Sequence, residues 1–173
     1  TRRQRQMCIR DRIEANLMVH ELAYIHPDAN IGKDVTIDPF AYVSGDVSIG
    51  EGTWVGSNAV IMDGARIGEN CKIGSNTILR NSIIKDNVTI LDNCVIGKKG
   101  FGFFPSQSKN LRYPHIGIVI INENSEIGCG STIDRGSLSN TEIGKNTFLD
   151  NQIHIAHNVK IGENTIIAGQ VGI

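Results

Sequence analysis

The sequence predicts an all-β solenoid in which short strands stack as parallel coils. Of 173 residues, 27 are Ile, 11 are Val and only 7 are Leu, and β-branched side chains favour strands over helices. Gly occurs 19 times and Asn 16 times, which indicates many tight turns, some with positive φ. Aliphatic residues also recur every six positions, an interval that returns to no face of a helix but fits a short strand plus a turn.

The six-residue repeat starts at Ile25 and runs without a slip to Leu79, and it resumes at Ile84 after a one-residue deletion. A unit of this size cannot bury its own apolar side chain, so the units must stack. The pattern resembles the hexapeptide repeat of left-handed parallel β-helices, in which three units, about 18 residues, complete a triangular coil with the aliphatic side chain inside. About seven coils are expected, truncated at the C-terminus, because the repeat is still in phase at Ile173 without a polar cap.

The N-terminal residues do not follow the repeat. Residues 1–12, TRRQRQMCIRDR, carry five Arg and resemble translated adaptor sequence, so we interpret them as a non-native segment. A basic arm for an acidic partner is the alternative. We expect a lead-in or N-terminal cap at 13–24 and the β-helix domain at 25–173.

Two interruptions divide the repeat, and a solenoid accepts insertions only at its corners. The smaller is an excess of four residues near 136–140. The larger, at about 98–116, carries basic residues and no acid. Solvent-facing rings in a loop favour a binding role. We expect a lid for an anionic, partly apolar ligand, and the alternative is that the rings cover the flank of the solenoid. Its aromatic and basic residues are Phe101, Phe103, Phe104, Tyr113, Lys98, Lys99, Lys109 and Arg112.

Net charge and the spacing of the cysteines narrow the possible ligands and the cellular compartment. The net charge of −1 and the pI of about 6.5 indicate no general attraction to nucleic acid. No apolar run approaches the ~20 residues of a transmembrane helix. The cysteines form no CxxC pair, which favours small buried thiols in a reducing compartment, the cytoplasm, over a zinc ribbon. They are Cys8, Cys71, Cys94 and Cys129.

A histidine pair suggests where chemistry could occur. His154 and His157 flank Ile155, which should point inward, so both should face outward. If the extra residues near 136–140 bulge at a corner, Ile133 lies beneath Ile155. An outer ledge would then gather four polar residues, namely His154, His157, Arg135 and Asp150.

Histidine suits proton transfer near neutral pH. A neighbouring carboxylate or amide could fix its tautomer, as the third member of a catalytic triad does. Since no Ser or Cys nucleophile accompanies the pair, direct transfer fits better than a covalent enzyme intermediate.

Three motifs in the second half carry a specific resemblance. GFGF at 100–103, STIDRG at 131–136 and DNQIHIAHN at 150–158 resemble the UDP-3-O-(3-hydroxyacyl)glucosamine N-acyltransferases of lipid A biosynthesis. The resemblance implies a homotrimer with active sites between subunits. It also implies transfer of a 3-hydroxyacyl chain from acyl carrier protein, through its phosphopantetheine, to the 2-amine of a UDP-3-O-acylglucosamine, with no metal and no bound cofactor.

The same resemblance assigns roles to residues of this chain. His157 corresponds to the catalytic base, and Asp150, Asn151 and Asn158 to groups that support it. The oxyanion donor would be a backbone N–H at position 175, beyond Ile173. The residues that we expect to bind substrate are His154, Arg135, Gly100, Phe101, Phe103, Lys98 and Lys99.

The first half, residues 20–72, resembles instead UDP-N-acetylglucosamine O-acyltransferase, the earlier enzyme of that pathway, through LAYIHPDANIGKDVTIDPF and the segment that follows. One possibility is an N-acyltransferase with an unusual start. The other is a join of two genes near residues 72–80.

Three further alternatives stay open. The chain could catalyse O-acylation, like the sister enzyme. It could be a metal hydratase of the γ-carbonic-anhydrase type, which needs three His on Zn²⁺. It could also be an inactive solenoid fragment, and we expect no activity from the 173 residues alone.

Overall fold

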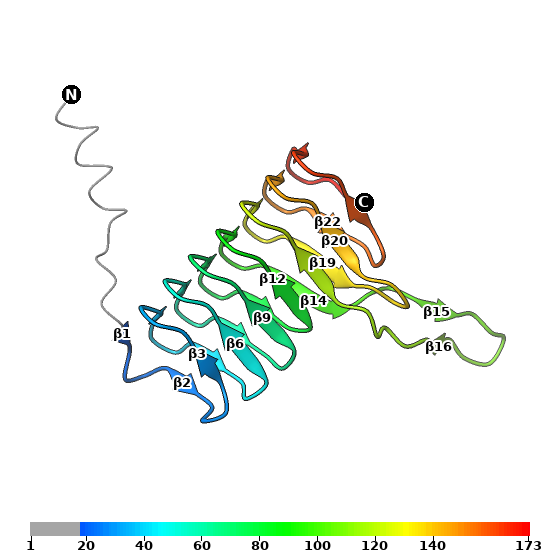
Figure 1. Ribbon diagram of the computed structural model, residues 1–173. Coiled ribbons are helices and arrows are strands. Elements are labelled where there is room, and N and C mark those ends of the chain that lie inside the picture. Colours follow the sequence, from blue (N-terminus) through cyan, green and yellow to red (C-terminus); the bar gives the residue numbers. More distant parts are fainter. Residues whose placement is uncertain (1–17) are drawn as a thin grey trace.

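A computed structural model describes residues 18–173 as a parallel β-solenoid from which one hairpin projects (Figure 1). Three sheets run along the solenoid, and all their strand pairs are parallel. Residues 18–173 contain no helix, and thus none that could cross a membrane. The predicted all-β solenoid is confirmed. The segment 1–12 and the first part of the lead-in at 13–24 lie outside the described residues.

Each sheet forms one face of the triangular solenoid. Face A has eight strands, in the order β1 (Met18–Val19), β4 (Thr36–Ile37), β7 (Trp54–Val55), β10 (Lys72–Ile73), β13 (Thr89–Ile90), β18 (Glu126–Ile127), β21 (Phe148–Leu149) and β24 (Ile166–Ile167). Face B has seven, namely β2 (Tyr24–Ile25), β5 (Tyr42–Val43), β8 (Val60–Ile61), β11 (Ile78–Leu79), β14 (Val95–Lys99), β19 (Thr132–Arg135) and β22 (His154–Ile155).

Face C also has seven strands, namely β3 (Asn30–Ile31), β6 (Val47–Ile49), β9 (Ala65–Ile67), β12 (Ser82–Ile84), β17 (Val119–Ile121), β20 (Thr141–Ile143) and β23 (Lys160–Ile161). The chain visits the faces in the order A, B, C, so each strand pairs with the equivalent strand one coil away. β1 already pairs with β4, so Met18 and Val19, within the predicted lead-in, belong to the ladder. Sheets of eight, seven and seven strands agree with the predicted number of coils.

The repeated aliphatic residue forms the core. Its side chains from Ile37 to Ile155 are at most 4% exposed, as the six-residue period predicts, and burying one such side chain contributes about 1.5–3 kcal/mol. Cys71 and Cys94 are buried, unpaired thiols of this core. Burial raises the pKa of both thiols, that of Cys94 to about 11.

The corners explain the abundance of Asn and Gly. In the described residues, fourteen residues other than Gly have positive φ, and ten of these are Asn, which tolerates this region better than most side chains. The Gly that follows the aliphatic residue is required for a different reason, which is the close approach of successive coils. A Cβ on Gly50 would lie 2.5 Å from the carbonyl carbon of Gly68, one coil away, so only a residue without a side chain allows the coils to stack there.

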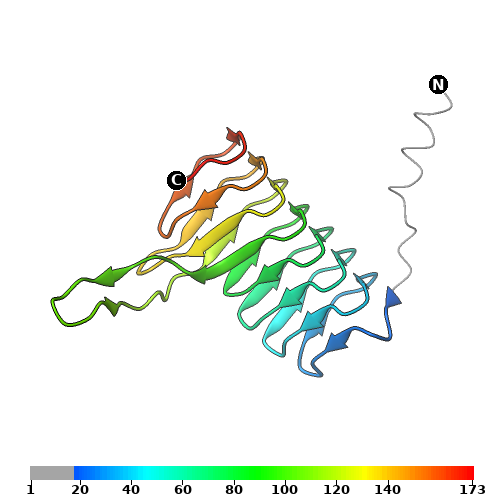
Figure 2. The same ribbon diagram turned by 180° about the vertical axis from the view of Figure 1, so that it is seen from behind.

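Both interruptions occur at one corner, the turn from face B to face C, which we call corner BC. The larger one leaves between β14 and β17 and forms the antiparallel hairpin β15 (Phe103–Phe104) and β16 (Leu111–Arg112), which projects away from the solenoid (Figure 2). The smaller one, residues 136–140, lies one coil further on, between β19 and β20.

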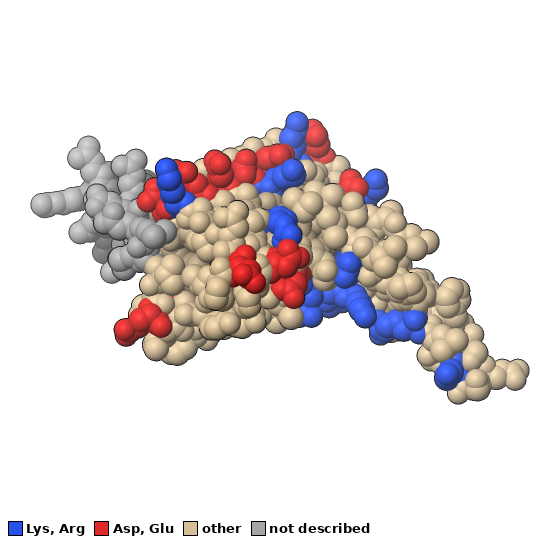
Figure 3. Space-filling model, turned by 60° about the horizontal axis from the view of Figure 1, so that its bottom comes forward, with Lys and Arg blue, Asp and Glu red and all other residues tan. Residues whose placement is uncertain are grey.

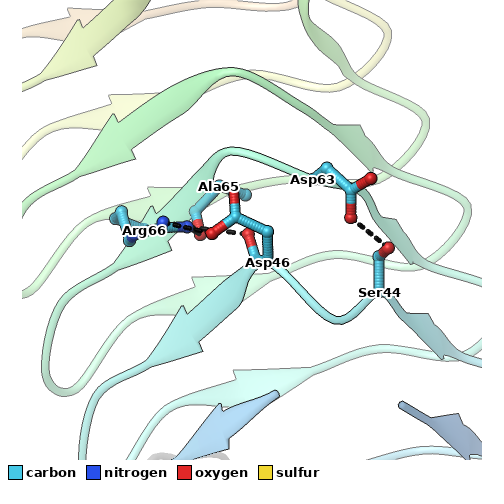
Figure 4. Close-up of polar contacts among 5 residues, drawn as sticks. All are labelled: Ser44, Asp46, Asp63, Ala65 and Arg66. Atoms are coloured by element: carbon cyan, nitrogen blue, oxygen red, sulfur yellow. Dashed lines mark hydrogen bonds and ion pairs between the residues drawn. The ribbon is translucent and has the colours of Figure 1, made fainter. Parts of the chain in front are cut away.

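In the N-terminal coils corner BC is uninterrupted, and its polar groups bond to one another (Figure 4). The Ser44 hydroxyl donates to the Asp63 carboxylate one coil away. Arg66 forms an ion pair with Asp46 and also donates to the Asp46 carbonyl oxygen at 2.7 Å. The regular corner thus satisfies its own side chains.

Candidate functional site

Three successive coils build a cluster of polar and aromatic groups at corner BC. The first contributes the hairpin, the second the loop 136–140, and the third His157 and Asn158. Ile133 pairs with Ile155, which confirms the stacking predicted from a bulge at 136–140. Segments that are distant in sequence therefore meet at one corner.

Asn158 holds the His157 ring. The Asn158 Oδ1 atom accepts hydrogen bonds from the Ser137 backbone N–H at 2.8 Å and from the Ser137 hydroxyl at 2.9 Å, while Nδ2 donates to the Ser139 hydroxyl at 2.7 Å. His157 Nδ1 lies 2.9 Å from the same Oδ1. Because Oδ1 can only accept, Nδ1 carries the hydrogen.

In the neutral imidazole the Nε2 atom of His157 therefore carries the lone pair, and it has no hydrogen-bond partner within residues 18–173. The ring is partly exposed. A half-buried imidazole with a fixed Nδ1–H tautomer and a free Nε2 is the arrangement of a general base.

A second imidazole lies beside His157. His115, where the hairpin returns to the solenoid, is 4% exposed. Its ring contacts that of His157 edge to face, with centroids 5.1 Å apart and an interplanar angle of 82°. On its other side it stacks on Tyr113 at 5.8 Å and 5°. Burial, followed by the neighbouring charges of His157 and Arg112, lowers the pKa of His115.

Gly100 packs against the rings of both His157 and His115. A Cβ at Gly100 would lie 2.7 Å from His157 Cδ2 and 2.9 Å from His115 Nε2. The Gly100 carbonyl oxygen accepts a hydrogen bond of 2.8 Å from Arg112 Nη1, which joins the two sides of the hairpin. Gly100 is thus a packing position for the two rings, and its predicted substrate contact stays a prediction.

Two basic residues predicted to bind substrate hold the base of the hairpin in place. Lys98 forms an ion pair with Asp134, whose side chain is 1% exposed. Arg135 donates from Nε to the Gly117 carbonyl oxygen at 2.6 Å and from Nη2 to that of Ile116 at 3.2 Å. Burial lowers the pKa of the Arg135 guanidinium. Neither is hydrogen-bonded to His157 within residues 18–173, so the predicted grouping of Arg135 with His157 and the substrate-binding roles of Lys98 and Arg135 stay predictions.

The outer part of the hairpin is free for a ligand. Phe101 and Phe104 are 77% and 62% exposed, so these two rings do not cover the flank of the solenoid. Phe103 is partly buried and packs edge to face on Phe101, with centroids 4.9 Å apart. Lys99 is exposed, and the face in Figure 3 shows Lys and Arg but no acidic side chains on the hairpin.

The remaining predicted residues lie elsewhere on the coil. Asp150 and Asn151 follow β21, at the corner between faces A and B. Asp150 accepts from the Gly169 backbone N–H at 3.0 Å, and Asn151 from that of Cys129 at 2.8 Å. His154 lies on the outer side of face B, with Nδ1 2.8 Å from the Thr132 hydroxyl. Within one chain none of the three bonds to His157, so their supporting and binding roles stay predictions.

Sequence reasoning missed His115, Ser137 and Ser139 as members of this cluster. No periodic signal marks His115, because it lies outside the repeat. The serines could have been found, since the bulge that aligns Ile133 with Ile155 also places residues 136–140 beside Asn158. Among residues 18–173, no three His, Cys, Asp or Glu side chains are grouped so that they could hold a metal ion.

The solenoid fold and the six-residue repeat define a hexapeptide-repeat protein. Comparisons with known proteins agree with this class. The model of the GMPPB C-terminal domain matches residues 13–100, just over half of the chain. The model of the bacterial transferase hexapeptide (six repeats) matches residues 140–173. The chain therefore belongs to the family described by the GMPPB C-terminal domain, and residues 140–173 carry the bacterial transferase hexapeptide repeat.

Curated proteins similar to this chain include UDP-3-O-acylglucosamine N-acyltransferases, which confirms the resemblance seen in the motifs. Two come from Nitrobacter winogradskyi. One is 55% identical over 90% of this chain and 43% of its own length, and the other is 58% identical over 87% and 44%. The chain thus spans less than half the length of these relatives.

A match over 90% of the chain must run across residues 72–80. Both halves therefore occur together in one N-acyltransferase relative. This favours a single gene over the join of two genes.

Solved structures show the same left-handed parallel β-helix. LpxA from Acinetobacter baumannii is 26% identical, with a TM-score of 0.59 over 88% of this chain and 51% of that chain. A mutant of AntD, an N-acyltransferase from Bacillus cereus, gives a TM-score of 0.64 at 22% identity over 81% and 79%, a likeness of fold alone.

Proposed function

We propose that the full-length protein transfers a 3-hydroxyacyl chain to the 2-amine of a UDP-3-O-acylglucosamine, with His157 as general base. The observation that carries this proposal is the Asn158 contact, which leaves His157 Nε2 as a free acceptor. The names of the relatives support the reaction class and the sugar. The place of the reaction is lipid A biosynthesis in the cytoplasm.

The reaction is thioester aminolysis. The sugar amine attacks the acyl carbonyl carbon, and His157 Nε2 accepts a proton from the amine as the C–N bond forms. The tetrahedral intermediate then expels the sulfur, the C–S bond breaks, and the proton passes from His157 to the thiolate. The proposed donor is acyl carrier protein, whose phosphopantetheine thiol is released. The exposed Phe101 and Lys99 support binding of a donor or sugar that is both apolar and anionic.

We further propose that the protein acts as a homotrimer. Within one chain Asp150 and Asn151 lie at the corner between faces A and B, whereas His157 lies at corner BC. If the two residues support the base, they must come from another chain. A site shared between subunits would satisfy this requirement.

The test is His157→Ala in the full-length protein, measured as amide formation from acyl-acyl carrier protein and UDP-3-O-acylglucosamine. Loss of a general base should lower kcat by about 10²–10⁴-fold. His26→Ala is the matched control, because His26 also follows a face B strand, in a regular coil, and its kcat should not change. An unchanged rate for His157→Ala contradicts the role of the base.

The O-acylation alternative is tested with the same protein. A parallel assay with UDP-N-acetylglucosamine offers a hydroxyl acceptor in place of the amine. Faster acylation of that hydroxyl would overturn the assignment to the amine.

A further inference from the structure

The imidazole of His115 has a defined hydrogen-bonding state. Its Nδ1 atom lies 3.3 Å from the Tyr113 carbonyl oxygen, which can only accept, so Nδ1 carries the hydrogen. The Nε2 atom then has a lone pair. This atom is buried and has no hydrogen-bond partner among residues 18–173, which is uncommon for a buried polar atom and calls for a reason.

The free Nε2 atom faces the base. His115 Nε2 and His157 Cδ2 both lie within 3 Å of the point where a Gly100 Cβ would be, and the two ring centroids are 5.1 Å apart, so both atoms lie on the Gly100 side of the ring pair. The Tyr113 ring, stacked on His115, and Gly102, which packs on both rings, prevent His115 from turning away. The negative end of a neutral imidazole is therefore held close to the Cδ2 side of the His157 ring.

We propose that His115 is a positioning residue that stabilises the protonated form of His157 during catalysis. This inference rests on the proposed function. When His157 accepts the amine proton, positive charge spreads over its ring, including the Cδ2–H edge. A fixed dipole with its lone pair toward that edge stabilises this charge without reorganising, and it is most effective in a site that excludes water.

The neutral state of His115 is essential to this role, since a second cation would oppose protonation of His157. The charged groups that act on it are His157 and Arg112, which disfavour its protonation, and Asp134, which favours it. Burial is the largest influence and also favours the neutral form.

The kinetic test compares His115→Phe with His115→Gln in the full-length protein, using the acyl-acyl carrier protein assay. Phe keeps a flat ring for stacking but has no acceptor, and we expect kcat to fall about 10-fold, less than for loss of a donor that touches the reacting atoms, with KM unchanged. Gln keeps an acceptor and should stay within about 3-fold of the unmodified enzyme. His20→Phe, at an exposed imidazole, is the control. Equal kcat for the Phe variant and the unmodified enzyme would overturn the proposal.

A second measurement does not depend on activity or on folding of the variants. ¹⁵N NMR of the imidazole nitrogens in the unmodified protein should show a protonated Nδ1 and an unprotonated Nε2 for His115 at neutral pH. A protonated Nε2 would refute the inference. If the NMR result holds but the unmodified enzyme does not acylate the amine, the proposed function fails instead.

Discussion

Corner BC differs between the N-terminal coils and the coils around His157. In the first region it only supports the fold, and in the second it carries the candidate site. In the N-terminal coils, Ser44 bonds to Asp63 and Arg66 to Asp46, so the corner closes on itself. Around His157 the same corner is interrupted in two successive coils. There the polar groups hold the rings in place but leave the lone pairs of the two imidazoles without partners. The parallel ladder continues through both regions, with one register shift between Ile96 and Lys98 in the pairing of β14 with β19. The larger difference therefore lies in what the corner leaves unsatisfied.

The largest effect that would sharpen this comparison is expected at Asn158. Asn158→Ala removes the acceptor that fixes the His157 tautomer, and kcat should fall about 10²-fold or more. Asn158→Asp keeps an acceptor for Nδ1 and should retain most activity. Asn76→Ala, at another positive-φ Asn (φ 59°), controls for backbone strain. Equal rates for the Ala and Asp variants would show that the tautomer is not what Asn158 provides.

The next effect contrasts the two ion pairs of corner BC. Lys98→Ala leaves the buried Asp134 carboxylate unpaired, and the free energy of unfolding should fall by about 3 kcal/mol. Arg66→Ala breaks an ion pair whose side chains are 45% and 61% exposed and should cost under about 1 kcal/mol. Urea unfolding of the two variants measures both. Similar losses would mean that the hairpin base is no more buried in solution than the regular corner.

A smaller effect is expected when each corner is crowded in the same way. A Cβ at Gly100 meets two rings of the site, whereas a Cβ at Gly45 lies 2.8 Å from the Nδ1 atom of His26. Gly100→Ala should lower kcat about 10-fold by displacing His157. Gly45→Ala should leave kcat unchanged, although it also moves an imidazole. Steady-state kinetics with both substrates measures kcat for the two variants. An equal change in kcat for both would show that Gly100→Ala acts only by lowering the stability of the fold.

The smallest effect is expected on the hairpin surface. Lys99→Ala removes an exposed charge and should raise KM for one substrate about 3-fold, with little change in kcat. Phe101→Ala should raise KM for the acyl donor by a similar factor, because the ring is 77% exposed and supports little of the fold. Unchanged KM values for both substrates in both variants would remove the hairpin from the binding site.

The sequence predicted the coils better than the site, for a physical reason. The period of six identifies the inward residue of every strand, so the pairing of Ile133 with Ile155 could be deduced by counting. His157 was found because it lies next to that frame, and Asn158 through the resemblance of DNQIHIAHN. His115 was missed because a hairpin returns along a path that periodicity does not describe. The contacts of Arg135 were also missed, since its direction depends on Gly117 and Ile116 in that returning segment.

The stacking of Gly50 on Gly68 has a consequence for how such proteins can change over time. Each coil stacks on its neighbours through a parallel backbone ladder, so a segment inserted at a corner, such as the hairpin that reaches His157 two coils further on, leaves the framework in place. New loops can therefore be acquired or lost without a redesign of the framework. A shared ancestor could diversify by exchanging corner segments while the inner aliphatic column stayed constant.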